Sequence, residues 1–153
     1  MIVGQEPSSS GLYGAMTFHH THLEMLARHV ISTFHGEGRS AAQTSFSAFK
    51  RQLDAHLDAE ETWLLPPFER ANPSAYDAIL AEHARLRAST DLAAAALDTE
   101  QIDEHPLHRL VEILCELCHR EEEGLYRWAE TAIDAHASRA VIQKIEGARL
   151  PET

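Results

Sequence analysis

Four side chains in this sequence combine metal-binding chemistry with helical spacing: His20, His56, Glu60 and His83. Each lies in phase with the apolar residues around it, at about 100° per residue, so all four are predicted to face a helical core. A lone inward histidine is more often a hydrogen-bonded core residue than a ligand. Three of them beside a carboxylate are costly to bury unless a cation neutralises the group. Imidazole and carboxylate together suit iron, manganese or zinc, so the pattern predicts a metal site.

Four amphipathic helices are expected to position these residues. Gly36-Glu37-Gly38 is predicted to stop the first helix, Pro66-Pro67 to break or bend the second, and Asn72-Pro73 to start the third. Strand-like alternation is absent, so the prediction is an all-α, up-down-up-down antiparallel four-helix bundle. The expected organisation is a disordered leader at 1–10, the bundle at 11–137 and a C-terminal extension at 138–153, and the expected helices span about 12–34, 40–65, 72–97 and 103–132.

The composition limits the classes of partner. The chain has 153 residues, 24 acidic against 13 basic residues and a formal net charge of −11. This balance argues against nucleic acid and against an anionic membrane surface, which both need clustered basic residues. The chain has no apolar run long enough to span a membrane and begins without a signal-peptide pattern, so a cytoplasmic location is expected. Eleven histidines against two lysines is the unusual feature of the composition.

Motifs on the first three predicted helices resemble those of the hemerythrin-like (HHE cation-binding) family. That family has a histidine on the first helix, His-x-x-x-Glu-Glu-x-x-Leu-Phe-Pro on the second and Glu-His-x-x-Leu on the third. The resemblance covers about residues 15–130. The matching segments here are His19-His20-Thr21-His22-Leu23, His56-Leu57-Asp58-Ala59-Glu60-Glu61-Thr62-Trp63-Leu64-Leu65-Pro66 and Glu82-His83-Ala84-Arg85-Leu86.

The resemblance implies a four-helix bundle with a non-haem di-iron site. Carried over residue by residue, His20, His56 and His83 would be iron ligands and Glu60 a bridging carboxylate. Two irons bridged by an oxo group or by carboxylates are expected, with zinc or manganese as alternative metals. Relatives of the family are linked to O₂ carriage or sensing, to responses to nitric oxide or peroxide, and to iron handling. O₂ or a small redox ligand is therefore the expected partner, and peroxidase-, catalase- or oxidase-like turnover stays open, as does association with a protein partner or a second copy.

The fourth predicted helix departs from the family pattern. Its segment 120–126 matches the family's Arg-Glu-Glu-x-Gly-Leu-Phe, which makes Glu121 the second bridging carboxylate. The histidine expected four residues earlier is Leu117. His119 and Glu123 have the right i, i+4 spacing, but their helical phase places both on the outer face, so they are doubtful ligands.

Two other interpretations stay open. The missing histidine raises the hypothesis of a mononuclear or metal-poor bundle that acts as an interaction module. Cys115-Glu116-Leu117-Cys118-His119 also forms C-x-x-C-H, the attachment signature of c-type haem, late in a helical bundle. The haem hypothesis leaves the four inward residues without a role. Two structural or redox-sensitive thiols are the alternative interpretation of the cysteines.

Overall fold

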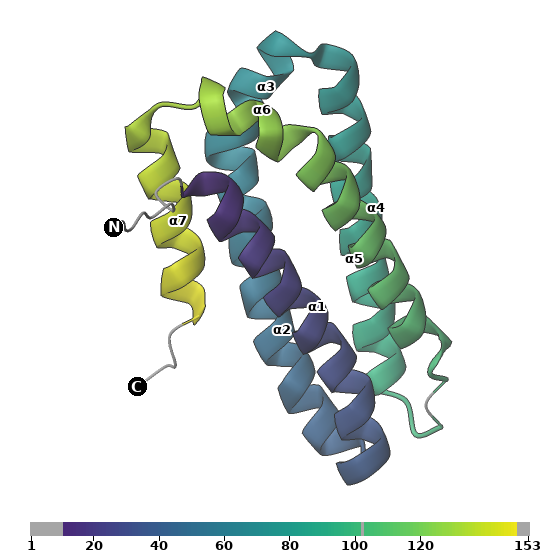
Figure 1. The fold of residues 1–153 in the computed structure, drawn as a ribbon. Coiled ribbons are helices and arrows are strands. Elements are labelled where there is room, and N and C mark those ends of the chain that lie inside the picture. The colour runs from purple at the N-terminus through teal and green to yellow at the C-terminus, as the bar shows by residue number, and fades with distance from the viewer. Residues whose placement is uncertain (1–10, 102, 150–153) are drawn as a thin grey trace.

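The computed structural model describes residues 11–101 and 103–149, and the described part of the chain is helical, with no strand. Its elements are α1 (Leu12–Glu37), α2 (Arg39–Ala59), the π-helix η1 (Glu60–Leu64), α3 (Leu65–Ala71), α4 (Pro73–Leu97), α5 (His105–Glu123), α6 (Leu125–Ala132) and α7 (Ala135–Arg149). The four long helices α1, α2, α4 and α5 lie side by side (Figure 1). The predicted all-α class is therefore confirmed. The predicted leader at 1–10 lies outside the described residues.

The helix boundaries follow from local sequence. Gly38 has a positive φ of 97°, a conformation that favours glycine, and its N–H donates to the carbonyls of Thr33 and Phe34 at the end of α1. Asn72 caps α4 by accepting a hydrogen bond from the N–H of Ala75, and Pro73 occupies the first turn. Both predicted signals are confirmed.

The prolines of the second predicted helix do not end it. The chain passes from α2 into the π-helix η1 and on into α3, where Pro66 and Pro67 lie in the first turn. A first turn tolerates proline because its N–H groups need no partner within the helix. The N–H of Leu65 donates instead to the carbonyl of Glu60, five residues earlier, which widens the turn at this glutamate.

The fourth predicted helix, expected to run to about residue 132, is divided in the structure. A break at Gly124 separates α5 from α6, and α7 then runs alongside α2 and α1 (Figure 1). Val141 and Ile145 of α7 are fully buried. The C-terminal residues therefore contribute to the core rather than only following it.

Two apolar clusters divide the interior. One lies among α1, α2, α4 and α5, and contains Leu23, Leu53, Leu86 and Leu114. The other lies toward α3, α6 and α7, and contains Met16, Leu64, Ile79 and Leu125. Along every long helix the predicted site residues fall between members of these two clusters. The site is therefore a polar layer inside an apolar bundle.

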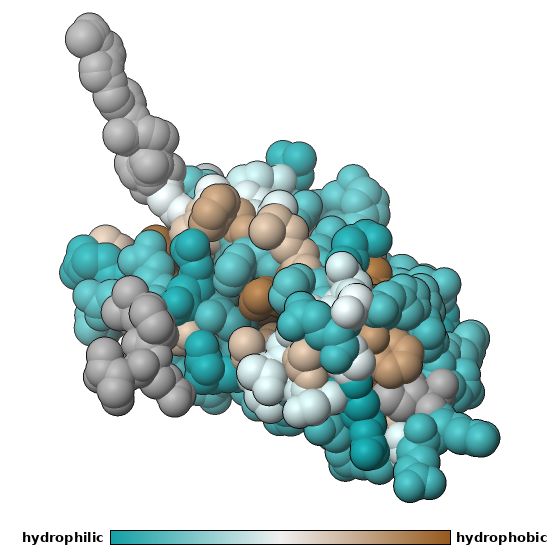
Figure 2. Space-filling model, turned by 90° about the horizontal axis from the view of Figure 1, so that it is seen from below, coloured by the Kyte–Doolittle hydropathy of each residue, from teal (hydrophilic) through white to brown (hydrophobic). Residues whose placement is uncertain are grey.

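The surface is mostly hydrophilic. On the face shown in Figure 2, apolar side chains appear as small separate areas among hydrophilic ones. Among the described residues, the large hydrophobic side chains that are exposed come from α1 and α4: Phe18, Met25, Leu80 and Leu92. No helix of the described residues is both long and apolar enough to cross a membrane.

Candidate metal centre

The structure brings together the five residues that the sequence favours as ligands. His20 comes from α1, His56 from α2, Glu60 from η1, His83 from α4 and Glu121 from α5. Each is at most 2% exposed. Charged and polar side chains buried to this degree need partners for their charges and hydrogen-bonding atoms. The five residues supply part of this requirement to one another.

The two carboxylates link the histidines across the layer. Glu60 places Oε2 at 2.9 Å from Nε2 of His56 and Oε1 at 3.1 Å from Nε2 of His83. Glu121 places Oε1 at 3.2 Å from Nε2 of His20 and Oε2 at 2.9 Å from the same His83 nitrogen. Each carboxylate thus faces His83 with one oxygen and a histidine of α1 or α2 with the other. The cluster has two ends, which we call the His20–His56 end and the His83 end.

The donor atoms fit a metal ion at the His20–His56 end. One ligand atom from each of His20, His56, Glu60 and Glu121 lies within 4.8 Å of the others. At the His83 end, Oε1 of Glu60 lies near His83 and is fully buried, yet it accepts no hydrogen bond of acceptable geometry. Nitrogen and carboxylate oxygen are ligands that iron, zinc and manganese accept. An orphaned carboxylate oxygen in such a group is what a cation would satisfy.

Protons neutralise the cluster when no metal is bound. Burial alone would lower the pKa of His83, but the carboxylates of Glu121 and Glu60 raise it to about 11. Burial also opposes the charged form of His20, and its partners Cys118, Glu121 and Glu122 raise the pKa well above its usual value. For Glu60, burial would raise the pKa, yet His56 and His83 hold it well below the ordinary range. A metal must displace such protons, so metal binding and protonation compete here.

The outward nitrogens of His20 and His83 face carboxylates. Nδ1 of His20 lies 2.8 Å from Glu122 Oε2, and Nδ1 of His83 lies 2.8 Å from Glu61 Oε2. Glu61 in turn accepts two hydrogen bonds from Arg87, at 2.7 and 3.1 Å. A carboxylate on the far nitrogen orients a ligand histidine and makes it more basic. The arrangement leaves Nε2 of both rings directed into the cluster.

His56 is oriented by a relay of two neutral side chains, Gln52 and His19. Gln52 donates from Nε2 to the carbonyl of Ala148 in α7, at 2.9 Å, so its Oε1 is the acceptor for Nε2 of His19, at 3.2 Å. With its proton on Nε2, His19 accepts at Nδ1 from Nδ1 of His56, 2.7 Å away. Burial, followed by the neighbouring His56, lowers the pKa of His19 to about 3, which keeps this ring neutral. His56 therefore presents Nε2 to the cluster.

Comparison with known proteins gives one match. The model of the hemerythrin HHE cation-binding domain matches residues 12–129, most of the chain. The chain belongs to this family. No curated protein and no solved structure matches it. The resemblance inferred from the motifs is thereby confirmed, and a hemerythrin HHE domain is expected to bind a metal cation.

The position where the HHE pattern has a fourth histidine is apolar. Leu117 is 2% exposed and belongs to the apolar cluster among the long helices. The His83 end therefore has one imidazole and the two shared carboxylates. His119 and Glu123, the doubtful ligands, are 73% and 68% exposed and pair with each other at 3.5 Å. The structure does not bring them to the cluster.

Two residues of this HHE domain join the cluster without having been predicted as site residues. One is His19, which is 1% exposed and contacts His56. The other is Tyr126, which is 0% exposed and whose hydroxyl donates to Glu60. The double histidine at 19–20 was a signal for the first. The signal for the second was the polar aromatic in the matched segment 120–126.

The cysteines of the C-x-x-C-H motif lie on α5 as free thiols. Cys118 is buried and Cys115 is partly exposed, while His119 faces solvent. Burial raises the pKa of the Cys118 thiol to about 12, which disfavours the reactive thiolate. This HHE domain therefore holds Cys118 as a buried, unreactive thiol.

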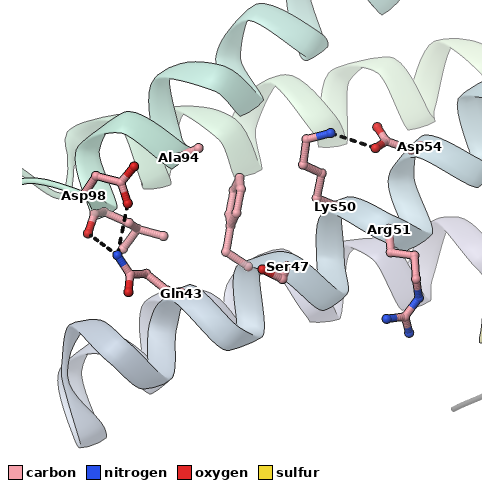
Figure 3. Close-up of a pocket in the computed structure, with 9 residues that line it drawn as sticks. Gln43, Ser47, Lys50, Arg51, Asp54, Ala94 and Asp98 are labelled. Atoms are coloured by element: carbon pink, nitrogen blue, oxygen red, sulfur yellow. Dashed lines mark hydrogen bonds and ion pairs between the residues drawn. The ribbon is translucent and has the colours of Figure 1, made fainter. Parts of the chain in front are cut away.

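An open groove between α2 and α4 is separate from the metal centre (Figure 3). At one end, Gln43 donates to the carbonyl of Leu97 and to Asp98, and farther along Lys50 pairs with Asp54. None of the cluster residues lines this groove. The HHE cluster is enclosed by the bundle, and the carboxylates nearest to solvent around it are the partly exposed Glu61 and Glu122.

Proposed function

We propose that the chain is a non-haem iron protein in which the four long helices form an antiparallel up-down-up-down bundle around two irons. Glu60 and Glu121 would bridge the irons, with His20 and His56 at one end and His83 at the other. The observation that carries the proposal is the buried histidine–carboxylate cluster with an orphaned Glu60 oxygen. The family match adds that a cation is the expected ligand.

The proposed activity is binding of, or response to, O₂, peroxide or nitric oxide. Bound iron supplies reversible one-electron chemistry toward such ligands. The chain's own part is to hold the donors in place, to exclude bulk water and to limit access to small molecules. Burial of every cluster residue supports this enclosure. Turnover of peroxide and handling of iron are further outcomes of the same site, and the experiment below separates them from simple binding.

The residues around the ligands have defined tasks in this proposal. Glu61 and Glu122 hold the rings of His83 and His20 through their outward nitrogens. His19 and Gln52 hold His56 in the tautomer that offers a lone pair to the metal. The protons displaced from the cluster on metal binding have a short way to solvent through Glu61 and Glu122, which are about a third exposed.

A mononuclear site is the second candidate. Leu117 favours it, because this buried apolar residue leaves the His83 end without a second imidazole. In that case iron would occupy the His20–His56 end, and His83 would serve only as a hydrogen-bonding partner of the carboxylates. The two candidates differ in the number of irons per chain, which is directly measurable.

The test is anaerobic titration of the purified protein with ferrous iron, followed by metal analysis and optical spectra before and after O₂, hydrogen peroxide or nitric oxide is added. Two irons per chain and a spectrum that changes with at least one of these ligands support the proposal. One iron per chain supports the mononuclear candidate. A Soret band in the protein as isolated, or no tight iron at all in folded protein, would overturn both. His119→Ala is the matched control and should bind iron like the parent chain.

A further inference from the structure

The hydroxyl of Tyr126 lies at the centre of the His20–His56 end. Its oxygen is 2.7 Å from His20 Nε2, 2.9 Å from His56 Nε2 and 3.0 Å from Glu121 Oε1, and it donates to Glu60 Oε2. These partners are the four residues whose donor atoms form the candidate metal group. One hydroxyl carries one proton, so it cannot donate to all four at once. The four side chains that converge on this hydroxyl would be better satisfied by a cation beside it than by its single proton.

Tyr126 also has a counterpart on the other carboxylate-bearing segment. The segment from α2 to α3 carries His56, Glu60 and Leu65, and the segment from α5 to α6 carries Leu117, Glu121 and Tyr126, at the same intervals of four and five residues. By this spacing His56 corresponds to Leu117, and Leu65 corresponds to Tyr126. Each segment therefore has one polar and one apolar residue at these two positions, in opposite order. The segment that lacks the histidine has the tyrosine, and the structure directs that tyrosine to the end that already has two histidines.

We propose that Tyr126 is a direct ligand, through its phenolate oxygen, of the iron held by His20, His56, Glu60 and Glu121. The inference rests on the iron site of the proposed function and deepens it. On binding, the phenol loses its proton to solvent as the bond from oxygen to iron forms, with no change in oxidation state. The His20–His56 end then has five protein donors, and the His83 end has three.

Ligation follows from the lack of any other place for the hydroxyl. An ion in contact with all four donors must lie next to the phenol oxygen, because this oxygen is within hydrogen-bonding distance of each of them. The side chain is 0% exposed and belongs to the apolar cluster around α3, α6 and α7. Moving the hydroxyl away from the ion would place it unpaired in that apolar core, at a cost of about 1–3 kcal/mol. Coordination needs no such movement.

The charge of the site points the same way. Two carboxylates and neutral imidazoles leave a ferric ion with excess positive charge in a buried position, and an anionic oxygen donor reduces it. Burial, with the carboxylates of Glu121 and Glu60, raises the pKa of Tyr126 well above its ordinary value, so the metal-free protein keeps the phenol neutral. The phenolate is therefore expected only in the metal-loaded protein.

The test uses the colour of ferric phenolate. The chain has three tyrosines, so Tyr13→Phe/Tyr76→Phe leaves Tyr126 as the only one. This double variant, the parent chain and Tyr126→Phe are loaded with iron, oxidised with ferricyanide and examined by visible absorption and resonance Raman spectroscopy. We expect a charge-transfer band with enhanced phenolate vibrations in the parent chain and in the double variant, developed by the first equivalent of iron. We expect the band to be lost in Tyr126→Phe, which should still bind iron.

The outcomes separate this inference from the proposed function. Iron-loaded parent protein without a phenolate band, or a band that persists in folded Tyr126→Phe, would overturn the ligation by Tyr126 and leave the iron site standing. Absence of bound iron in the parent chain would overturn both. If Tyr126→Phe does not fold, as judged by circular dichroism, the double variant decides the question without any change at Tyr126.

Discussion

The His20–His56 end and the His83 end of the cluster share two carboxylates but differ in the number and kind of their other donors. The first end has two imidazoles and the Tyr126 hydroxyl, and one of its rings is held by the neutral His19–Gln52 pair. The second has one imidazole, held by Glu61 and Arg87, and an apolar residue where a second ring would stand. A bundle can thus place most donors of a histidine–carboxylate cluster at one of its two ends.

The difference shows that the packing of the helices and the number of metal-binding side chains at each end can vary independently. The two carboxylate-bearing segments keep the same spacing, and Glu60 and Glu121 are both 0% exposed. Exchange of one histidine for leucine and of one leucine for tyrosine leaves the packing intact and makes the ends chemically unequal. The metal affinities of the two ends are expected to differ accordingly.

The largest effect is expected from a residue that serves both ends. Glu60→Ala removes an oxygen from each end at once, and it leaves His56 and His83 without their shared carboxylate. We expect loss of tightly bound iron at both ends, measured as iron per chain after desalting. Glu123→Ala changes an exposed glutamate of the same chemistry and should keep the parent iron content. Equal iron in the two variants would show that Glu60 is not a shared ligand.

The next prediction tests whether the two ends differ in iron affinity. His56→Ala should abolish the first, tighter equivalent of iron, whereas His83→Ala should keep the first equivalent and lose only the second. Anaerobic titration of both variants, monitored by calorimetry, provides the comparison. If His83→Ala loses the first equivalent as fully as His56→Ala does, the two ends act as one unit and the comparison fails.

A histidine introduced at position 117 should reduce the difference in iron affinity between the two ends. Leu117→His is expected to tighten the second equivalent of iron by about tenfold or more, corresponding to about 1.4 kcal/mol. The metal-free variant should be less stable than the parent by about 1–3 kcal/mol, because an imidazole replaces a buried apolar side chain.

Leu114→His is the matched control for that variant. It introduces the same side chain into the same apolar cluster, about one turn earlier on α5. It should show the loss of stability in denaturant titrations without the gain in affinity. Tightening in Leu114→His as well would mean that any buried histidine of α5 suffices and that position 117 has no special relation to the site.

Helical periodicity predicted four residues of the main cluster, His20, His56, Glu60 and His83, and the family pattern of segment 120–126 added Glu121. All five are buried in the structure, and Glu60 lies in η1 directly after α2. Periodicity also placed His119 and Glu123 on the outer face, where they are found. These residues all lie in segments where the 3.6-residue repeat applies, or at its boundary.

Tyr126 escaped prediction because the repeat does not hold around it. In an unbroken helix, a residue five positions after Glu121 points well away from it. The break at Gly124 brings Tyr126 back to the cluster, as the π-turn at Glu60 brings Leu65 back on the other segment. Wide turns of this kind are set by tertiary packing and by prolines or glycines whose effect on phase is not fixed by sequence alone.

His19 was underestimated for a different reason. Adjacent to His20, it lies at the edge of the apolar stripe of α1, and its burial depends on what covers that edge. The cover comes from Gln52 of α2 and from α7, whose Ala148 carbonyl fixes the amide of Gln52. The sequence predicted only a C-terminal extension at 138–153, so the long-range contact that buries His19 was not predictable from the pattern of α1.

A further effect, confined to one end of the cluster, concerns the relay of Gln52 and His19. His19→Phe removes the acceptor of the His56 Nδ1 proton and frees the ring tautomer, so iron affinity at the His20–His56 end should fall by about 10- to 100-fold. Affinity at the His83 end should be nearly unchanged, because its outward partner is Glu61. His29→Phe, at an exposed position of α1, is the control for the added aromatic ring.

The relay also has a signature in metal-free protein. The pKa of His19 is lowered from 6.5 to about 3 by burial, so between these pH values the unfolded chain takes up a proton at this residue that the folded chain does not. Stability contributed by His19 is therefore lost as the pH falls from 6.5 toward 3. His19→Phe removes this contribution, and its free energy of unfolding should decline less steeply over that range in urea titrations. An unchanged slope would mean that His19 is protonated in the folded protein, and then its Nδ1 could not accept from His56.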